Sequence, residues 1–132
     1  MASFRGISVV LASIVVAILV VRSTAEPDVS VIASACDGKQ VSLVSDYAHA
    51  RSKALDDAVA KTPTNTFDFR GKGSYNSAES YSHGKCNGKI DRADCWTCMR
   101  IAETNILRYC TTNAEGWVQL KDCYVGFWEF KN

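Results

Sequence analysis

The stretch "CNGKIDRADCWTC", from Cys86 to Cys98, places three thiols at the spacing C-x8-C-x2-C. Thiols at such spacings can form a redox centre, a metal site or a set of disulfide bonds. The compartment of the protein decides much of this, because disulfides persist in oxidising environments and are rare where thiols are kept reduced.

The N-terminus indicates a secreted chain. Residues 1–25 combine a short basic head, an apolar run over residues 7–21 and small residues at the expected cleavage positions. A retained membrane anchor is the alternative, but the run is short for a spanning helix and a cleavage site follows it. We therefore predict a signal peptide at residues 1–25, a single mature domain at 26–132 and no membrane span after signal removal.

The composition of the mature part excludes several classes of function. Its 107 residues suit one small domain. Two basic residues and no acidic ones leave with the signal, so thirteen basic and fourteen acidic residues remain and the formal charge is −1. A near-neutral chain is a poor candidate for binding nucleic acid or for disrupting membranes by positive charge. We expect no nucleic-acid partner.

All six cysteines lie in the mature part. They are Cys36, Cys86, Cys95, Cys98, Cys110 and Cys123. An even count in a short secreted chain predicts three disulfides, although fifteen pairings are possible and spacing alone does not choose among them. The redox alternative rests on "CWTC", but no thioredoxin-like strand and helix precede it. His49 and His83 lie at no recognisable zinc-ligand spacing, so we expect ordinary surface histidines, no metal and no cofactor.

Two segments have the periodicity of helices. "VSDYAHARSKALDDAVAKTP", residues 44–63, begins with a capping candidate in Ser45 or Asp46 and stops before Pro63. "RADCWTCMRIAETNILRYC", residues 92–110, has Asp94 available as a cap. One face of this second helix carries Cys95, Cys98, Met99, Ala102, Ile106 and Cys110, with Arg100, Glu103 and Arg108 facing outward.

Four segments alternate or carry aromatic and β-branched residues, which predicts strands. They are "TFDFRGKG" (66–73), "ESYSHGKC" (79–86), "GWVQLKDC" (116–123) and "YVGFWEFK" (124–131). The stretch at residues 70–89 is rich in Gly, Ser and Asn, which favours hairpin loops.

These segments resemble the plant ginkbilobin-type domain, also called the stress-antifungal or cysteine-rich secretory repeat. The likeness rests on "CNGKIDRADCWTC", "MRIAETNILRYC" and "GWVQLKDCYVGFWEF", and on "VIASAC", which matches the family's opening strand. It covers roughly residues 30–130. The resemblance implies an α+β fold, with one antiparallel sheet of about five strands packed with two helices. It also implies three disulfides: Cys36–Cys110, Cys86–Cys95 and Cys98–Cys123.

The sequence gives no support for catalysis. Its thiols are expected to be bonded, and neither a Ser-His-Asp order nor an H-E-x-x-H helix occurs. Asp91, Asp94, Glu103 and Glu129 could be considered as a glycosidase pair, but surface acids are the commoner explanation. We expect no enzyme activity.

The resemblance implies a secreted, apoplastic defence protein of the plant that binds mannose-type or other cell-wall glycans and acts against fungi. The same domain also forms the outer parts of plant receptor-like kinases and of proteins at cell-to-cell channels. The alternative is therefore an extracellular interaction module whose partner is a receptor or a pathogen protein, without sugar binding.

In mannose-binding members of the family, three polar residues hold the sugar: an Asn after the first cysteine, an Arg before the "VQL" segment and a Glu in the last strand. The matching positions here are Asp37, Trp117 and Trp128, with Glu129 one residue further on. Trp117 stands where these members have the Arg, so the cationic hydrogen-bond donor is missing. Adjacent strand residues point to opposite faces of a sheet, so Glu129 reaches the face of position 128 only through a bulge. These four residues form the predicted ligand site. Trp117 and Trp128 either stack on a sugar there or pack against the domain.

Overall fold

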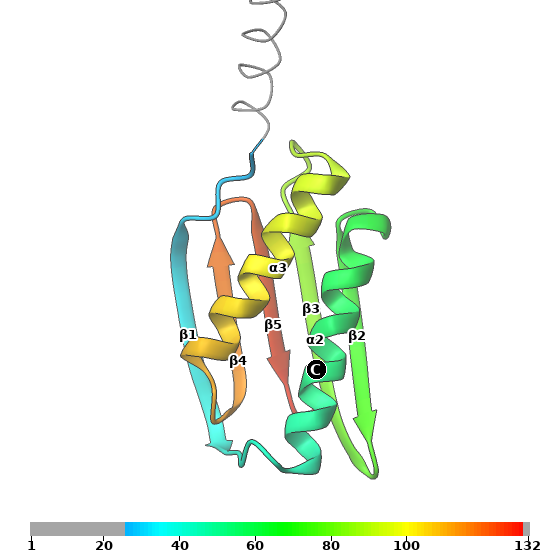
Figure 1. The fold of residues 1–132 in the computed structure, drawn as a ribbon, viewed down its shortest axis with the longest axis vertical. Helices are drawn as coiled ribbons and strands as arrows, with labels where there is room; N and C mark the ends of the chain where they lie inside the picture. The colour runs from blue at the N-terminus through cyan, green and yellow to red at the C-terminus, as the bar shows by residue number, and fades with distance from the viewer. Residues whose placement is uncertain (1–25, 131–132) are drawn as a thin grey trace, which may run out of the picture.

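The computed structural model describes residues 26–130; the predicted signal peptide lies outside them (Figure 1). These residues form one antiparallel sheet of five strands and two α-helices, joined by three disulfides. The predicted α+β class is confirmed. The elements are β1 (Val31–Gln40), α2 (Asp46–Lys61), the 3-10 turn η1 (Thr62–Thr64), β2 (Asp68–Tyr75), β3 (Ala78–Cys86), α3 (Arg92–Tyr109), β4 (Asn113–Leu120) and β5 (Cys123–Trp128).

The strands lie in the order β1-β4-β5-β3-β2, and every neighbouring pair is antiparallel. Both helices cross the same face of this sheet, α2 over β2 and β3 and α3 over β4 and β5 (Figure 1). No described helix covers the opposite face, which we call the open face. The two faces therefore have different surroundings.

Helix α2 begins where the sequence provides a cap. The Ser45 hydroxyl accepts a hydrogen bond from the Ala48 N–H at 3.2 Å, and the helix ends one residue before η1, which contains Pro63. The alanines on its inner side pack closely on β2. At Gly73 an added Cβ would lie 2.1 Å from the Ala50 carbonyl oxygen, so only glycine permits this approach.

This packing corrects the interpretation of residues 70–89 as loops. Most of them form the paired strands β2 and β3, and the turn between these strands is only Asn76 and Ser77. The small residues facing α2 serve helix-sheet contact; for example, the Ser82 hydroxyl donates to the Ala54 carbonyl at 2.6 Å. Strand β2 begins at Asp68 instead of at residue 66, because Thr66 and Phe67 have positive φ angles of 56° and 61°.

Helix α3 begins at Arg92, the first residue of the predicted segment, but with a different cap. Its N-cap is Asp91, whose Oδ1 accepts a hydrogen bond from the Asp94 N–H at 2.8 Å, so the prediction of Asp94 as the cap is wrong. Asp91 has an extended backbone at φ −83° and ψ 175°, the geometry that a capping carboxylate needs. The predicted inner face is buried, and Ile106 and Met99 meet the sheet there.

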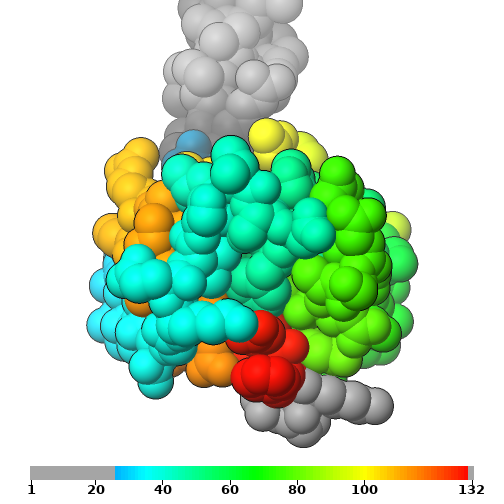
Figure 2. Space-filling view, turned by 90° about the horizontal axis from the view of Figure 1, so that it is seen from below, coloured from blue at the N-terminus to red at the C-terminus, as the bar shows by residue number. Residues whose placement is uncertain are grey.

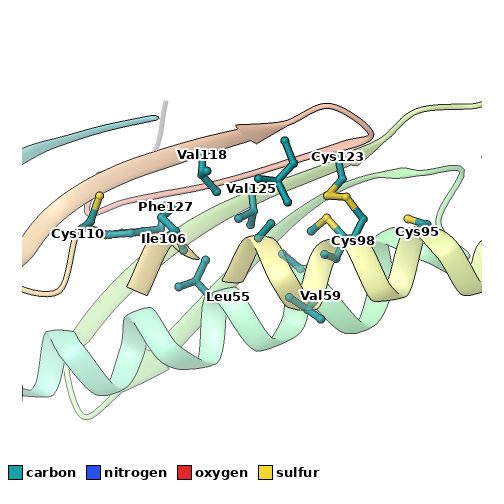
Figure 3. Close-up of a cluster of buried hydrophobic side chains, with 14 residues drawn as sticks. Leu55, Val59, Cys95, Cys98, Ile106, Cys110, Val118, Cys123, Val125 and Phe127 are labelled. Atoms are coloured by element: carbon teal, nitrogen blue, oxygen red, sulfur yellow. A yellow bond between two sulfur atoms is a disulfide. The ribbon is translucent and has the colours of Figure 1, made fainter. Parts of the chain in front are cut away.

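The core lies between the helices and the sheet (Figure 3). Its main apolar side chains are Leu55, Met99, Ile106, Val118, Leu120, Val125 and Phe127. Three disulfides border it: Cys36–Cys110, Cys86–Cys95 and Cys98–Cys123, the same pairs that the resemblance implies. By the loop-entropy model, the long loop closed by the first bond is worth about 4–5 kcal/mol and the short loop closed by the second about 2.5–3.

Glu103 does not face outward as predicted. Burial and the nearby Asp56 carboxyl on α2 raise the pKa of Glu103 to about 7, whereas the Arg100 guanidinium opposes this shift. Its Oε2 is buried and has no hydrogen-bond partner among the described residues. An acidic pair therefore lies between the two helices.

Candidate functional site

Successive side chains of β4 and β5 point to opposite faces of the sheet. Val118 and Phe127 point to the helices and are at most 1% exposed. Trp117, Tyr124 and Trp128 occupy the alternate positions and point to the open face. Three large aromatic side chains are thereby presented on the side that no described helix covers.

These rings border a hollow of about 220 Å³. Its lining includes the side chains of Asp37, Glu115, Trp117, Tyr124 and Trp128, together with Ala35, Gly116 and Phe127 of the same strands, and we call it the aromatic hollow. The structure thus brings together three of the four predicted residues: Asp37, Trp117 and Trp128. Because small-molecule pockets usually measure about 300–1,000 Å³, this hollow suits one unit of a longer ligand.

The aromatic wall is continuous across three strands. The ring centroids of Trp117 and Tyr124 are 6.3 Å apart, and those of Tyr124 and His83 are 5.8 Å apart in an edge-to-face arrangement. Burial raises the pKa of Tyr124 above its ordinary value of 10, so its hydroxyl stays protonated and can donate a hydrogen bond. Trp117 is 37% exposed, which leaves part of its ring available to a ligand.

Two carboxylates stand beside these rings. Asp37 on β1 lies directly opposite Glu115 on β4 in the register of the sheet. The Asp37 Oδ1 accepts a hydrogen bond from the Gly38 N–H at 2.7 Å, and Gly38 has a φ of +80° where the pairing of β1 becomes irregular. Within residues 26–130 neither carboxylate has an ion-pair partner.

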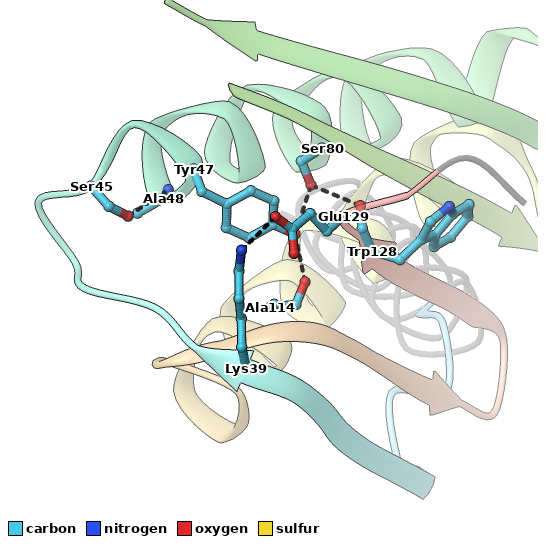
Figure 4. Close-up of polar contacts among 8 residues, drawn as sticks. All are labelled: Lys39, Ser45, Tyr47, Ala48, Ser80, Ala114, Trp128 and Glu129. Atoms are coloured by element: carbon cyan, nitrogen blue, oxygen red, sulfur yellow. Dashed lines mark hydrogen bonds and ion pairs between the residues drawn. The ribbon is translucent and has the colours of Figure 1, made fainter. Parts of the chain in front are cut away.

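Glu129 does not join the hollow. Strand β5 ends at Trp128 and keeps a regular register with β3 and β4, so no bulge turns the next residue to the open face. Glu129 instead forms an ion pair with Lys39, whose Nζ lies 2.8 Å from its Oε1. Figure 4 shows Trp128 and Glu129 pointing in different directions.

A buried hydrogen-bond network holds the end of β5. The Ser80 hydroxyl donates to the Trp128 carbonyl at 3.3 Å and lies 3.3 Å from the Tyr47 hydroxyl (Figure 4). Tyr47 in turn donates to the carbonyl of Ala114, the residue before Glu115. Seen from below, the red C-terminal end of the described chain lies between the cyan residues and the green residues (Figure 2). The backbone on both sides of the hollow is thereby fixed.

A second hollow, of about 380 Å³, continues the open face beyond Tyr124. Its polar lining includes Lys85, Asn87, Gln119, Lys121 and Asp122, and we call it the basic hollow. Each of its lysines has an aspartate nearby: Lys85 lies 3.8 Å from Asp68, and Lys121 lies 3.4 Å from Asp28.

Other chemical roles find little support in residues 26–130. No group of three or more His, Cys, Asp or Glu side chains could hold a metal ion there. His83 Nε2 lies 2.7 Å from Asp68, and His49 stacks on Tyr75 with centroids 4.6 Å apart. The helices of this part are too short or too polar to cross a membrane.

Glu115 and Tyr124 also line the hollow, although the sequence pattern alone did not point to them. Their signal was the two-residue period of the strands. Glu115 precedes Trp117 by two positions and Tyr124 precedes Trp128 by four, so each shares a face with a tryptophan.

Residues 35–129 match the family described as Salt stress response/antifungal. The chain belongs to this family. It is 25% identical over 122 residues to the antifungal protein ginkbilobin-like protein 2 of Picea glauca, a match covering 91% of this chain and 92% of that protein. It is also 25% identical over 103 residues to plasmodesmata-located protein 4 of Arabidopsis thaliana, covering 76% of this chain and 30% of that protein.

Two solved structures share the fold. Both are tandem DUF26 ectodomains of cysteine-rich receptor-like proteins of Arabidopsis thaliana. PDLP5 matches with a TM-score of 0.69 at 19% identity, covering 77% of this chain and 51% of that chain. PDLP8 matches with a TM-score of 0.65 at 21% identity, covering 81% of this chain and 48% of that chain. This chain therefore spans about half of each tandem ectodomain.

Proposed function

We propose that this protein is a secreted defence protein of the extracellular space that binds carbohydrate through the aromatic hollow and acts against fungi without catalysis. Support comes from relatives named as antifungal proteins and from a fold shared with receptor-like ectodomains. The single observation that carries the sugar-binding part is the grouping of Asp37, Trp117 and Trp128 around one hollow on the open face.

The chemistry of this hollow suits a sugar. Aromatic rings stack on the apolar C–H face of a pyranose, while carboxylates and a phenol bind its hydroxyl groups. The hydrogen bonds of Tyr47 and Ser80 limit movement of the strands, so binding a ligand should cost little conformational entropy. Mannose itself should bind feebly, because the hollow has no cationic donor at Trp117 and Glu129 is paired with Lys39 elsewhere.

A glycan array tests this proposal. The oxidised protein, secreted by a eukaryotic host, should bind a subset of cell-wall glycans, and the free sugar should compete. The Trp117→Ala variant should lose this signal, whereas Trp96→Ala should keep it, since Trp96 is 46% exposed on α3, outside the hollow. An array on which the native protein binds no glycan contradicts the proposal.

A second candidate function is that of an extracellular interaction module, and the exposed strand β1 favours it. All ten residues of β1 are exposed, and among the described residues 26–130 only one of its edges pairs with a neighbouring strand. An unpaired edge can add a strand from a partner protein. A blank array together with capture of a receptor ectodomain would favour this function over sugar binding.

A further inference from the structure

The charges of the aromatic hollow are unusual for this sheet. Asp37 and Glu115 are like charges directly opposite on adjacent strands, an arrangement that destabilises a sheet. The other acidic residues of the strands have basic neighbours: Asp68 lies beside His83 and Lys85, and Glu79 lies 3.0 Å from Lys72. The pair in the hollow is thus uncompensated within residues 26–130.

The nearest lysine of the same strand does not relieve this repulsion. Lys39 follows Asp37 by two residues, but its ammonium group pairs with Glu129 at 2.8 Å. The pairing of β1 with β4 is irregular between Asp37 and Gln40, where Gly38 has a φ of +80°. A ligand that brings a positive charge to the hollow would therefore meet two carboxylates that have no ion-pair partner within residues 26–130.

The aromatic rings favour the same ligand. A cation near the face of a Trp or Tyr ring is attracted by the π-system, and the effect grows when water is excluded. Trp117, Tyr124 and Trp128 also offer apolar surface for the ring of a sugar. A lysine side chain has the charge but no ring to cover this surface, so the hollow favours a cationic sugar over a basic peptide.

We propose that the aromatic hollow binds a protonated amino sugar, the glucosamine unit of a cationic glycan. Its ammonium group lies between Asp37 and Glu115, and its C–H face packs on the aromatic wall. This inference rests on the proposed carbohydrate binding and names its ligand class. N-acetylation removes the charge, so the acetylated sugar loses the charge-assisted contacts of its ammonium group with the two carboxylates and keeps the stacking and the hydroxyl hydrogen bonds.

Titration calorimetry with the intact secreted protein tests the proposal. A hexamer of β-1,4-linked glucosamine should bind at least about tenfold tighter than the N-acetylated hexamer, since bonds between charged groups are the stronger ones. Asp37→Asn combined with Glu115→Gln should abolish this preference without unfolding the domain, because the change removes a like-charge pair. Near-ultraviolet circular dichroism checks that the variant is folded.

The matched control is Asp68→Asn combined with Glu79→Gln. It changes the net charge by the same amount on the same sheet but outside the aromatic hollow, so it should keep the preference for glucosamine. If the control loses the preference as fully as the hollow variant does, the effect is general charge attraction and the proposal fails.

The remaining outcomes separate this inference from the proposed function. Equal binding of both hexamers, unchanged in the hollow variant, overturns the amino-sugar ligand and leaves carbohydrate binding intact. Binding of hexalysine as tight as that of the glucosamine hexamer overturns the sugar class in favour of a basic peptide. Absence of binding to every glycan, neutral or cationic, overturns the proposed function and this inference together.

Discussion

On β5, Phe127 packs in the core beneath the helices and is 1% exposed, whereas the next residue, Trp128, is half-buried and points to the open face of the sheet, beside the aromatic hollow. The same alternation separates Val118 from Trp117 on β4. The covered face is apolar, closely packed and bounded by disulfides. The open face combines aromatic rings with two carboxylates, Asp37 and Glu115, that have no ion-pair partner in the described part of the chain. Substitutions on the covered face should therefore lower stability, and those on the open face should lower binding with a smaller cost in stability.

The largest expected effect follows removal of the bond that holds β1 to the end of α3. Cys36→Ala combined with Cys110→Ala should lower the free energy of unfolding by about 4.5 kcal/mol, because the bond closes a loop with a sequence separation of 74 residues. Urea denaturation of the otherwise oxidised protein measures the loss. Cys86→Ala with Cys95→Ala, which opens a separation of only 9 residues, should cost about 2.6 kcal/mol. The reverse order would contradict the loop-entropy explanation.

The covered face is tested next by Phe127→Ala. Phe127 is among the largest fully buried side chains, and the Arg51 guanidinium lies 5.3 Å from its ring centroid. Its truncation should cost about 4 kcal/mol, within the roughly 3–5 kcal/mol typical of such cavities. Phe127→Leu keeps most of the volume and should cost less than about 1.5 kcal/mol. If the two variants lost similar amounts of stability, the contribution of Phe127 would not come from filling the core.

The pH dependence of stability should come from the helix side of the domain. Burial and Asp56 raise the pKa of Glu103 from 4.5 to about 7. Between these values the folded protein retains a proton that the unfolded chain releases, so stability falls as the pH rises. A single titrating group changes the free energy of unfolding by at most about 1.4 kcal/mol per pH unit. Glu103 is partly exposed, so solvent screening makes the change smaller than this.

Thermal melting between pH 4 and 8 measures this effect. The Glu103→Gln variant should show a flatter profile and should be more stable than the native protein at pH 8. Asp37→Asn, on the open face, serves as the control. An unchanged profile in Glu103→Gln would mean that another group carries the pH dependence.

The fold was predictable because its signals are local or depend on cysteine spacing. Ser45 and Pro63 mark the ends of α2, and the periodicity of residues 92–110 identifies the buried face of α3. The prediction of loops at residues 70–89 was wrong because glycine occurs both in turns and where two backbones pack closely. Gly71 and Gly73 lie in strand β2, where the absence of a side chain lets α2 pack closely. A local sequence pattern does not show this contact, because it joins two separate segments.

The candidate site was only partly predictable. The family pattern leads to Asp37, Trp117 and Trp128, which the structure groups around one hollow. It does not lead to Glu115, because the pairing of Glu115 with Asp37 depends on the register between β1 and β4. Nor does sequence show that Glu103 lies against Asp56, since this contact depends on how the two helices pack.

The smallest effect on stability, and the sharpest test of the open face, is expected from Trp117→Ala. Because Trp117 is 37% exposed, water can fill the space left by the ring and little cavity cost arises, so stability should fall by about 1 kcal/mol. Glycan affinity should nevertheless fall by about tenfold, since the ring supplies much of the stacking surface. Calorimetry and urea denaturation of the same preparation measure the two effects, and Trp96→Ala should change neither by as much. If Trp117→Ala lowers stability as much as Phe127→Ala and leaves affinity intact, the ring serves packing, and the division of roles between the two faces is wrong.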